Sequence, residues 1–143
     1  MTTPRTRYVP PTDAQHAAAE RWVAGFAERW AKLDPDALRD LMHDDTRNLI
    51  PPMNAPANSD GVVAHFKQVL AMLPDLRLEV VRWAATDDAV FVEWAATAHV
   101  AGRALTWRGV DRVRLRGDRT CESEAFWDTR RVQALVAEAR GAG

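Results

Sequence analysis

The hydrophobic pattern of this sequence changes its period once, near Pro74, and that change limits the folds open to the chain. Before Pro74, apolar residues recur three or four positions apart, as on one face of a helix. After Pro74, apolar and polar residues alternate along four stretches that short turns separate. Helices followed by consecutive strands favour an α+β fold in which the helices cover one face of an antiparallel sheet. We therefore predict a cone-shaped α+β fold, with three N-terminal helices packed on a strongly curved, mostly antiparallel sheet.

Capping residues, prolines and turn residues place the expected elements. Polar, proline-rich residues 1–12 predict a flexible arm, and residues 13–140 predict a single domain without internal repeats or a linker. Helices are expected over residues 13–32, over a short segment from residue 35 to about 42, and over residues 60–73. Strands are expected over residues 46–50, 76–85, 89–100, 104–116 and 120–130, and a last helix over residues 132–140.

Composition argues against several functions and compartments. The formal net charge is −1 over 143 residues, which gives no attraction to nucleic acid or to an anionic membrane. The lone cysteine, Cys121, excludes an intrachain disulfide and a multi-cysteine metal site. No spacing of His, Asp and Glu resembles a metal site and no glycine-rich loop would hold a phosphate, so we expect neither a metal nor a cofactor. The N-terminus has no apolar signal segment and no apolar run would span a membrane, so we expect a cytoplasmic protein.

One carboxylate stands on the apolar face of a predicted strand. Side chains alternate between the two faces of a strand, so residues 107, 109, 111, 113 and 115 share one face. That face is apolar apart from Asp111, whereas the other face is mostly arginine. A buried carboxylate is costly unless it is paired, protonated or used in chemistry. Asp111 is therefore the candidate catalytic residue, as general acid, base or hydrogen-bond donor, and a purely structural carboxylate is an equal alternative.

Opposite charges on neighbouring strands predict a register. A two-residue turn at Gly102-Arg103 places Arg112 opposite Glu93, and the following turn places it opposite Glu124 as well. The preceding turn places Arg82 opposite Glu93. The arginine-rich face is therefore expected to be a salt-bridged outer surface rather than a nucleic-acid site.

The same register predicts a cavity beside Asp111. Trp94 and Ala125 flank Asp111 in this register, and small residues among tryptophans leave space there. Helices over a curved sheet would enclose that space, which is the usual place for a small-molecule site. Glu79 would lie diagonal to Asp111 and could pair with it, but a slip at the preceding turn would place it outside, and we favour the surface.

Structural roles are expected for most other polar candidates. His43 is expected to cap the C-terminal end of the second helix. Cys121 is expected to face the cavity beside Leu115 as a small apolar side chain. Three histidines are expected to be exposed: His16, His65 and His99.

Three segments resemble the nuclear transport factor two-like superfamily, and in particular its SnoaL-like and ketosteroid isomerase-like members. The segments are ERWVAGFAERWAKLDPDALRDLMHDDT, SDGVVAHFKQVLAMLPDLRLEV and GVDRVRLRGDRTCESEAFWD. The resemblance covers nearly the whole chain. It implies the cone-shaped fold, a cavity for a small molecule, and a homodimer formed through the outer face of the sheet.

The resemblance also assigns single residues. Asp111 falls where ketosteroid isomerases keep a protonated aspartate, but their tyrosine and their base fall at Phe26 and near Ile50, which cannot replace them. The catalytic aspartate of SnoaL-type cyclases falls near Ala125, and the histidine that assists it falls at Asp111. An asparagine that lines the cyclase pocket resembles Asn48.

These observations predict a SnoaL-like enzyme that uses acid–base chemistry of the cyclase, isomerase or hydrolase type on a hydrophobic, cyclic small molecule. Asp111 is expected to be neutral near physiological pH because its surroundings disfavour the charged form. The alternative is a non-catalytic small-molecule-binding or accessory protein on the same scaffold, since the second catalytic group of the relatives is missing. The expected substrate-binding residues are Trp22, Phe26, Asn48, Trp94, Trp107 and Trp127.

Overall fold

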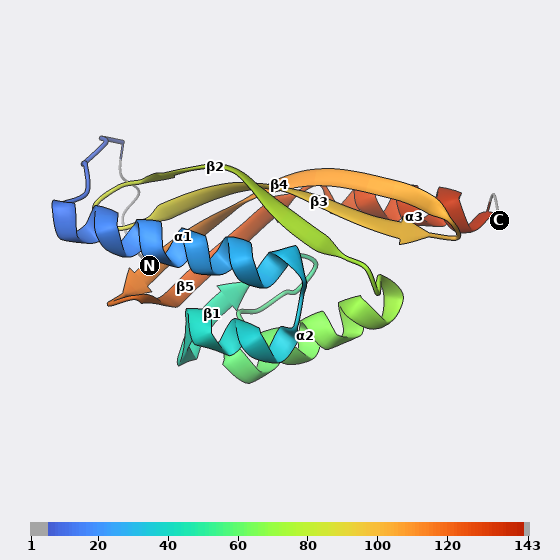
Figure 1. Ribbon diagram of the computed structural model, residues 1–143, viewed down its shortest axis with the longest axis horizontal. Coiled ribbons are helices and arrows are strands. Elements are labelled where there is room, and N and C mark those ends of the chain that lie inside the picture. The colour runs from blue at the N-terminus through green and yellow to red at the C-terminus, as the bar shows by residue number, and fades with distance from the viewer. Residues whose placement is uncertain (1–5, 142–143) are drawn as a thin grey trace.

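Residues 6–141 are described in a computed structural model, and their helices and strands follow the predicted order (Figure 1). The first five residues of the predicted arm lie outside the described residues. The helices are α1 (Asp13–Ala31), the 3₁₀ helix η1 (Pro35–Leu41), α2 (Ser59–Met72) and α3 (Thr129–Gly141). The strands are β1 (Met42–Leu49), β2 (Arg77–Ala85), β3 (Val90–Val100), β4 (Arg103–Arg116) and β5 (Arg119–Trp127). None of the described helices is long and apolar enough to cross a membrane.

The two longer N-terminal helices begin where side chains satisfy free backbone N–H groups. The Thr12 hydroxyl accepts a hydrogen bond from the N–H of Gln15 at 3.1 Å, and the Gln15 side chain accepts one from the N–H of Thr12 at 2.8 Å. The Asn58 side chain starts α2 by accepting a hydrogen bond from the N–H of Gly61 at 3.0 Å. α1 then buries a stripe at helical spacing: Ala19, Trp22, Val23, Phe26 and Trp30.

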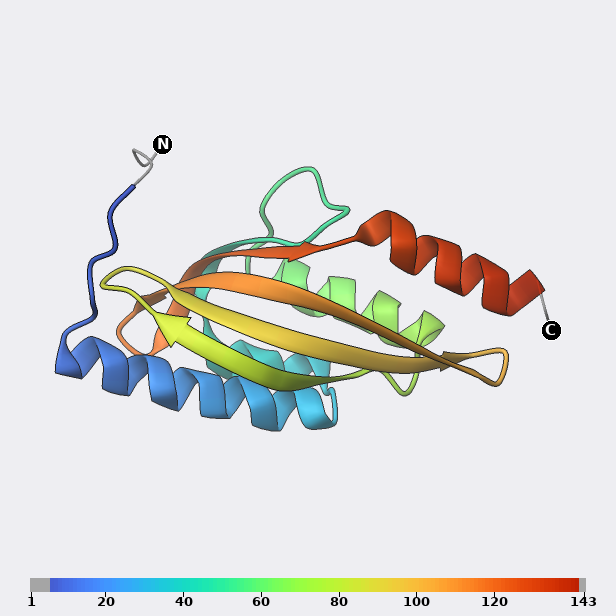
Figure 2. The ribbon, with the colours of Figure 1, turned by 90° about the horizontal axis from the view of Figure 1, so that it is seen from above.

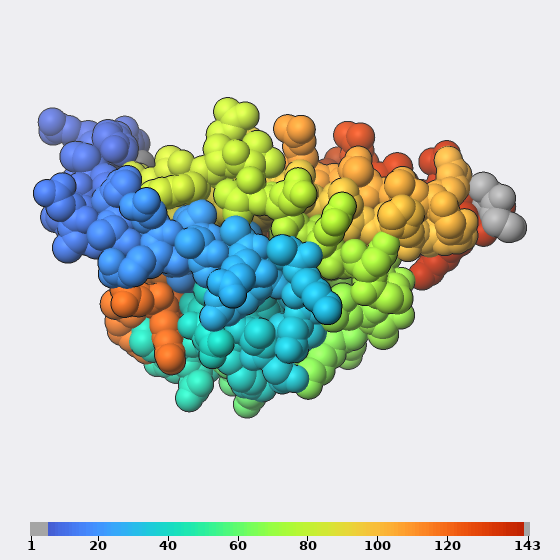
Figure 3. Space-filling view, viewed as in Figure 1, coloured from blue at the N-terminus to red at the C-terminus, as the bar shows by residue number. Residues whose placement is uncertain are grey.

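The sheet has the strand order β1-β5-β4-β3-β2, and only β1 runs parallel to its neighbour, β5. The predicted α+β fold with a mostly antiparallel sheet is therefore confirmed. α1, η1 and α2 lie on one side of the curved sheet (Figure 1), and the side chains of α1, η1 and α2 cover the space beneath it on the side seen in Figure 3. α3 follows β5 and continues along the far end of the sheet (Figure 2).

Strand β1 begins earlier than its sequence pattern predicts. The expected strand starts at residue 46, but β1 starts at Met42, directly after η1. Consecutive polar residues hide the alternation, and the hydrogen bonds of β1 come from β5, which is remote in sequence. His43 therefore lies in a strand, where its Nε2 is 2.7 Å from the carbonyl oxygen of Arg116. The prediction that His43 caps a helix was wrong.

The register between β3 and β4 differs from the predicted one by two residues. Val100 pairs with Arg103, so the turn is Ala101-Gly102, and both turn residues have positive φ, 50° and 78°. Positive φ at both central residues suits the twist of a two-residue hairpin. Because side chains alternate with a period of two, this shift keeps every side chain on its predicted face. Asp111 accordingly pairs with Val92 rather than with Trp94.

Charged side chains meet on the outer face of the sheet, although one predicted pair is absent. Arg112 contacts Glu124 at 3.0 Å, as predicted. Arg82 contacts Glu93 at 3.1 Å, as predicted. The shifted register places Phe91, not Glu93, opposite Arg112, so that predicted pair was wrong.

A bulge in β2 decides where Glu79 points. The pairing of β2 with β3 shifts by one residue between Val80 and Arg82, so Glu79 pairs with Ala95. Ala95 belongs to the outer face, and Glu79 is exposed there. The favoured surface position of Glu79 is confirmed, and the cause is the bulge rather than a slip at the turn.

Candidate functional site

A cavity of about 610 Å³ lies between the helices and the concave face of the sheet. Its walls come from α1, η1, β1, α2, the inner faces of β2, β3, β4 and β5, and α3. A volume of this size is typical of sites for drug-sized ligands. All seven candidate residues line this one cavity: Trp22, Phe26, Asn48, Trp94, Trp107, Asp111 and Trp127. Their catalytic and binding roles stay predictions.

Aromatic rings form the wall contributed by the helices. Trp22 and Phe26 are stacked with ring centroids 5.2 Å apart, and Trp30 follows Phe26 at 5.9 Å. Phe66 of α2 meets Trp30 edge to face at 4.9 Å. The turn-by-turn spacing of α1 creates this row, because residues four apart lie on one face of a helix. The row favours flat, apolar ligands, to which aromatic faces and edges give extensive contact.

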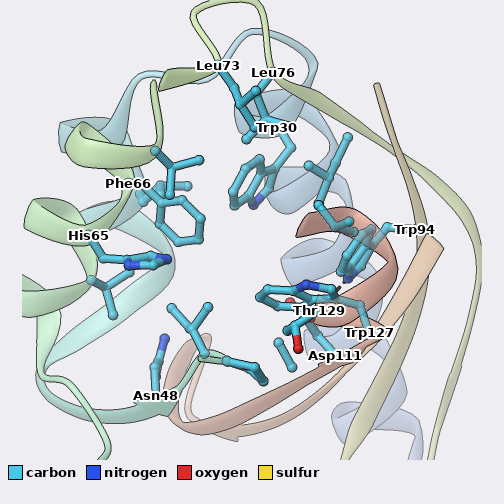
Figure 4. A pocket seen from close by; sticks show the side chains of 18 of the residues that line it. Trp30, Asn48, His65, Phe66, Leu73, Leu76, Trp94, Asp111, Trp127 and Thr129 are labelled. Carbon is cyan, nitrogen blue, oxygen red and sulfur yellow. Dashed lines mark hydrogen bonds between the residues drawn. The ribbon is translucent and has the colours of Figure 1, made fainter. Parts of the chain in front are cut away.

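The carboxyl group of Asp111 has one hydrogen-bond partner among the described residues. The indole Nε1 of Trp94 donates to Oδ1 at 2.9 Å. Every deeply buried side-chain nitrogen or oxygen in the described part of the chain has a partner. Oδ2 of Asp111 has no hydrogen-bond partner among the described residues, so it cannot be one of these deeply buried atoms and retains accessible surface. Asp111 lines the cavity (Figure 4). One carboxyl oxygen is thus fixed by the protein and the other is open to a ligand.

Burial raises the pKa of Asp111 to about 6, and the N–H of Trp94 lowers it by a smaller amount. The direction agrees with the prediction, because the neighbouring arginines, Arg112 among them, lie on the outer face and no cation contacts the carboxyl group in the described residues. A pKa of about 6 nevertheless leaves the group mostly ionised at pH 7. The expectation of a neutral carboxyl group near physiological pH was therefore wrong. At neutral pH Asp111 is suited to accept a proton, and below pH 6 to donate one.

Gly109 makes the contact between Trp94 and Asp111 possible. The two residues Trp94 and Gly109 pair across β3 and β4, and the indole lies over the glycine. A Cβ atom on Gly109 would lie 2.5 Å from Cη2 of Trp94 and 2.8 Å from the carbonyl oxygen of Phe126. Only a residue without a side chain fits there, so the indole can lie flat against β4 and extend its N–H to the next inward residue.

Sequence reasoning missed His65. The structure places His65 half-buried on the cavity wall, whereas the prediction was an exposed side chain. Burial lowers the pKa of the His65 imidazole below its usual 6.5. The signal was present in the sequence, because Val62 precedes His65 by three positions and Val69 follows it by four, and both valines line the cavity.

Asn48 presents an oriented amide to the same space. Its backbone pairs with Ala57 through hydrogen bonds of 2.9 and 2.8 Å, which fix this end of β1. The Thr46 hydroxyl donates to Asn48 Oδ1 at 2.6 Å, so the amide nitrogen turns toward the cavity, with the Met42 sulfur 4.0 Å away. Figure 4 shows His65 and Asn48 on the side of the cavity opposite Asp111.

The last helix supplies a wall that the sequence did not predict. One face of α3 lines the cavity at helical spacing: Thr129, Val132, Gln133, Val136, Ala137 and Arg140. The helix itself was predicted, three residues shorter at its start. Its part in the cavity depends on the direction in which the chain leaves β5, which no local pattern determines.

Three further polar predictions have mixed outcomes. Cys121 does not line the cavity, because a bulge after Arg114 pairs Leu115 with Thr120, and Thr120 takes the inward position. His99 is exposed as expected and contacts Asp75 at 2.6 Å. His16 is also exposed, with its ring 5.3 Å from that of Trp83. In the described part of the chain, no cluster of three or more His, Cys, Asp or Glu side chains could hold a metal ion.

Comparison with known proteins finds similarity over most of the chain. Residues 20–123 match the family described as the SnoaL-like domain. No curated protein sequence matches the chain. The candidate polyketide cyclase IdmH from Streptomyces antibioticus has a TM-score of 0.74 at 20% identity, over 83% of this chain and 98% of that one. A candidate polyketide cyclase from Acidithiobacillus ferrooxidans has a TM-score of 0.73 at 19% identity, over 85% and 96%.

A third similar structure is a hypothetical protein from Catenulispora acidiphila with a ketosteroid isomerase-like fold, in complex with trimethylamine. Its TM-score is 0.72 at 18% identity, over 81% of this chain and 92% of that one. At these identities the structures show a shared fold, and activity has to be argued from the residues of this cavity.

Proposed function

The chain belongs to the family of SnoaL-like domains, and from this membership we propose that it is a small-molecule enzyme that moves a proton on a hydrophobic, cyclic substrate. Asp111 is the group that carries the proton. One observation supports this role above the others: a carboxyl group with one oxygen held by Trp94 and the other open to an aromatic cavity.

The proposed step is proton abstraction from a carbon next to a carbonyl group. Oδ2 of the ionised carboxyl group takes the proton, the electron pair of the C–H bond forms a carbon–carbon double bond, and the carbonyl oxygen becomes an enolate oxygen. Return of the proton to the same carbon gives exchange, and its return to another carbon of a conjugated enolate completes an isomerisation. Attack of the enolate carbon on a second carbonyl carbon would close a ring, and the resulting alkoxide would take the proton back from Asp111. The raised pKa of about 6 suits this role, because a base works best when its pKa is near the working pH.

The substrate class follows from the walls. Apart from Asp111, His65 and Arg140, the described lining residues are uncharged over the whole titration range, and most are aromatic or aliphatic. Such walls favour an apolar, ring-containing ligand with few polar groups.

The alternative function is non-catalytic binding of the same class of ligand. Phe26 and Ala125 line the cavity at positions where relatives keep polar catalytic groups, and neither can donate or accept a proton. A binding protein needs the cavity but does not need the raised pKa of Asp111.

Hydrogen exchange in 2-tetralone tests the proposal, because this aromatic ketone carries acidic hydrogens beside its carbonyl. We expect the protein to accelerate loss of these hydrogens in D₂O, followed by proton NMR, and Asp111→Ala to slow it by about 10² or more. Asp111→Asn should be equally slow, since an amide cannot take the proton. Asp44→Asn, which removes an exposed carboxylate, is the matched control and should behave as the wild type. Binding without exchange would favour the alternative function.

We also propose that two copies associate through the outer face of the sheet. Large apolar side chains are exposed on three strands of the sheet: Phe126 (46%) on β5, Val81 (40%) on β2 and Phe91 (38%) on β3. Exposed apolar side chains between paired charges are suited to a self-complementary interface. Sedimentation at micromolar concentration should show a dimer that Phe126→Glu converts to a folded monomer, and a wild-type monomer would contradict the proposal. The predicted cytoplasmic location stays a prediction.

A further inference from the structure

We propose that His65 binds a second oxygen of the ligand, on the wall opposite Asp111, so that the ligand is an aromatic compound with hydroxyl or carbonyl oxygens at both ends. This inference rests on the proposed function of the cavity. It adds a specificity-determining residue and narrows the ligand class from apolar rings to rings with two separated polar groups.

The ring nitrogens of His65 are free to meet a ligand. No group in the described part of the chain forms a hydrogen bond with either ring nitrogen of His65. Both nitrogens keep accessible surface, and the residue lines the cavity. The ring is held by an edge-to-face contact with Phe66 at 4.9 Å. In Figure 4 the imidazole extends from α2 toward the centre of the cavity. The residue is therefore positioned by packing, while its hydrogen-bonding capacity is unused.

A structural role alone would not require an imidazole here. His65 stands in an apolar row of α2, where a leucine or phenylalanine would pack without polar atoms. Partial burial of an unpaired polar group is unfavourable, and a ligand oxygen that pairs with it removes that cost. Because burial lowers its pKa, the imidazole is neutral at pH 7 and has one N–H donor and one acceptor nitrogen. It can bind a hydroxyl or a carbonyl group.

The position of His65 fixes where the second oxygen must be. α2 and β1 form the wall opposite β4, and Figure 4 shows His65 and Asn48 together on that side, with Asp111 across the open space. The amide nitrogen of Asn48, oriented by Thr46, adds a donor beside the imidazole. A ligand that spans the cavity therefore meets the carboxyl group at one end and these two groups at the other.

Matched pairs of simple phenols test the inference. The probes are 2-naphthol and naphthalene-2,6-diol, and 4-phenylphenol and biphenyl-4,4′-diol, which give two frame lengths. Isothermal titration calorimetry measures each Kd for the wild type and for His65→Phe, His65→Gln and His16→Phe. His16→Phe is the matched control, because His16 is exposed and outside the cavity.

We expect at least one diol to bind the wild type about tenfold more tightly than its one-oxygen partner, as one added hydrogen bond allows. In His65→Phe this ratio should fall to about the twofold advantage that a symmetric diol has from its two equivalent orientations. His65→Gln should keep part of the ratio, and His16→Phe all of it.

Two results would overturn the inference in different ways. A ratio that is the same in His65→Phe and in the wild type, for both frames, would show that His65 binds no ligand oxygen, while binding of the phenols would still support the cavity. Failure of all four compounds to bind the wild type would overturn the proposed ligand class and this inference together. Thermal unfolding of each variant without ligand establishes that the compared proteins are folded.

Discussion

The two faces of β4 carry charge in different ways. On the outer face, Arg112 contacts Glu124 at 3.0 Å, and both side chains remain about 40% exposed (44% and 34%). On the inner face, Asp111 meets no cation in the described residues and is bonded only to the N–H of Trp94. Exposed ion pairs contribute little stability, whereas a buried carboxyl group without a cation has a strongly altered pKa. On the outer face of β4, the Arg112–Glu124 pair matches the register with β5. On the inner face, the Asp111 carboxyl group is available for chemistry.

Among the substitutions that compare the two faces, Asp111→Asn is expected to change the free energy of unfolding most. Burial raises the pKa of Asp111 from 3.8 to about 6, so the folded protein binds the proton more tightly than the unfolded chain. The stabilising contribution is complete below pH 3.8 and is lost as the pH rises to about 6. The shift corresponds to about 3 kcal/mol. Urea unfolding should therefore show Asp111→Asn gaining about this much stability relative to the wild type between pH 4 and pH 7.

Asp44→Asn is the control for that experiment, because Asp44 is exposed. Its stability relative to the wild type should change little over the same range. A pH-independent difference between Asp111→Asn and the wild type would mean that the inner face does not disfavour the charged carboxylate.

Gly109→Ala is expected to have the next largest effect. The added methyl group would meet the Trp94 ring and the carbonyl oxygen of Phe126, both held by packing or by the sheet. Overpacking of this kind costs about 1–3 kcal/mol. Val110→Ala, one position along on the outer face, removes two methyl groups from a half-buried side chain and should cost less. Equal losses in urea unfolding would show that the inner face is not the more tightly packed one.

The ion pair of the outer face should give the smallest effect. A double-mutant cycle of Arg112→Ala and Glu124→Ala is expected to yield a coupling free energy below about 1 kcal/mol, and less at high salt. A coupling free energy of several kcal/mol would mean that the outer ion pair stabilises the sheet strongly, which would contradict the stated difference between the two faces.

Properties that depend on local period could be predicted from the sequence. The change of period at Pro74 identified the fold, and alternation placed Asp111, Trp94 and Trp107 on the inner face. The two-residue error in the register of β3 with β4 did not alter these faces, because the strand period is two. Charge pairing favoured the wrong turn, Gly102-Arg103, because that register places Glu93 opposite Arg112. The observed turn, Ala101-Gly102, places Phe91 there instead.

Properties that depend on remote segments could not be predicted. β1 was placed too late because β5, its partner, lies more than 70 residues away and supplies hydrogen bonds that no local pattern shows. A bulge, not a turn, moved Glu79 outward, and another moved Cys121. His65 is a different case: its spacing from Val62 and Val69 was visible in the sequence, but a histidine on a helix was interpreted as a solvent-facing residue.

The contact of Trp94 with Gly109 has a consequence for the history of this chain. The ring fills the space where a side chain on residue 109 would be, so neither position can enlarge alone without separating the strands. A descendant that acquires a side chain at 109 must first, or at the same time, exchange the tryptophan for a smaller residue, and it then loses the donor that holds Oδ1 of Asp111. We therefore expect Trp94, Gly109 and Asp111 to change together in related chains, and a chain that lacks the tryptophan to orient the carboxyl group in another way or not to use it.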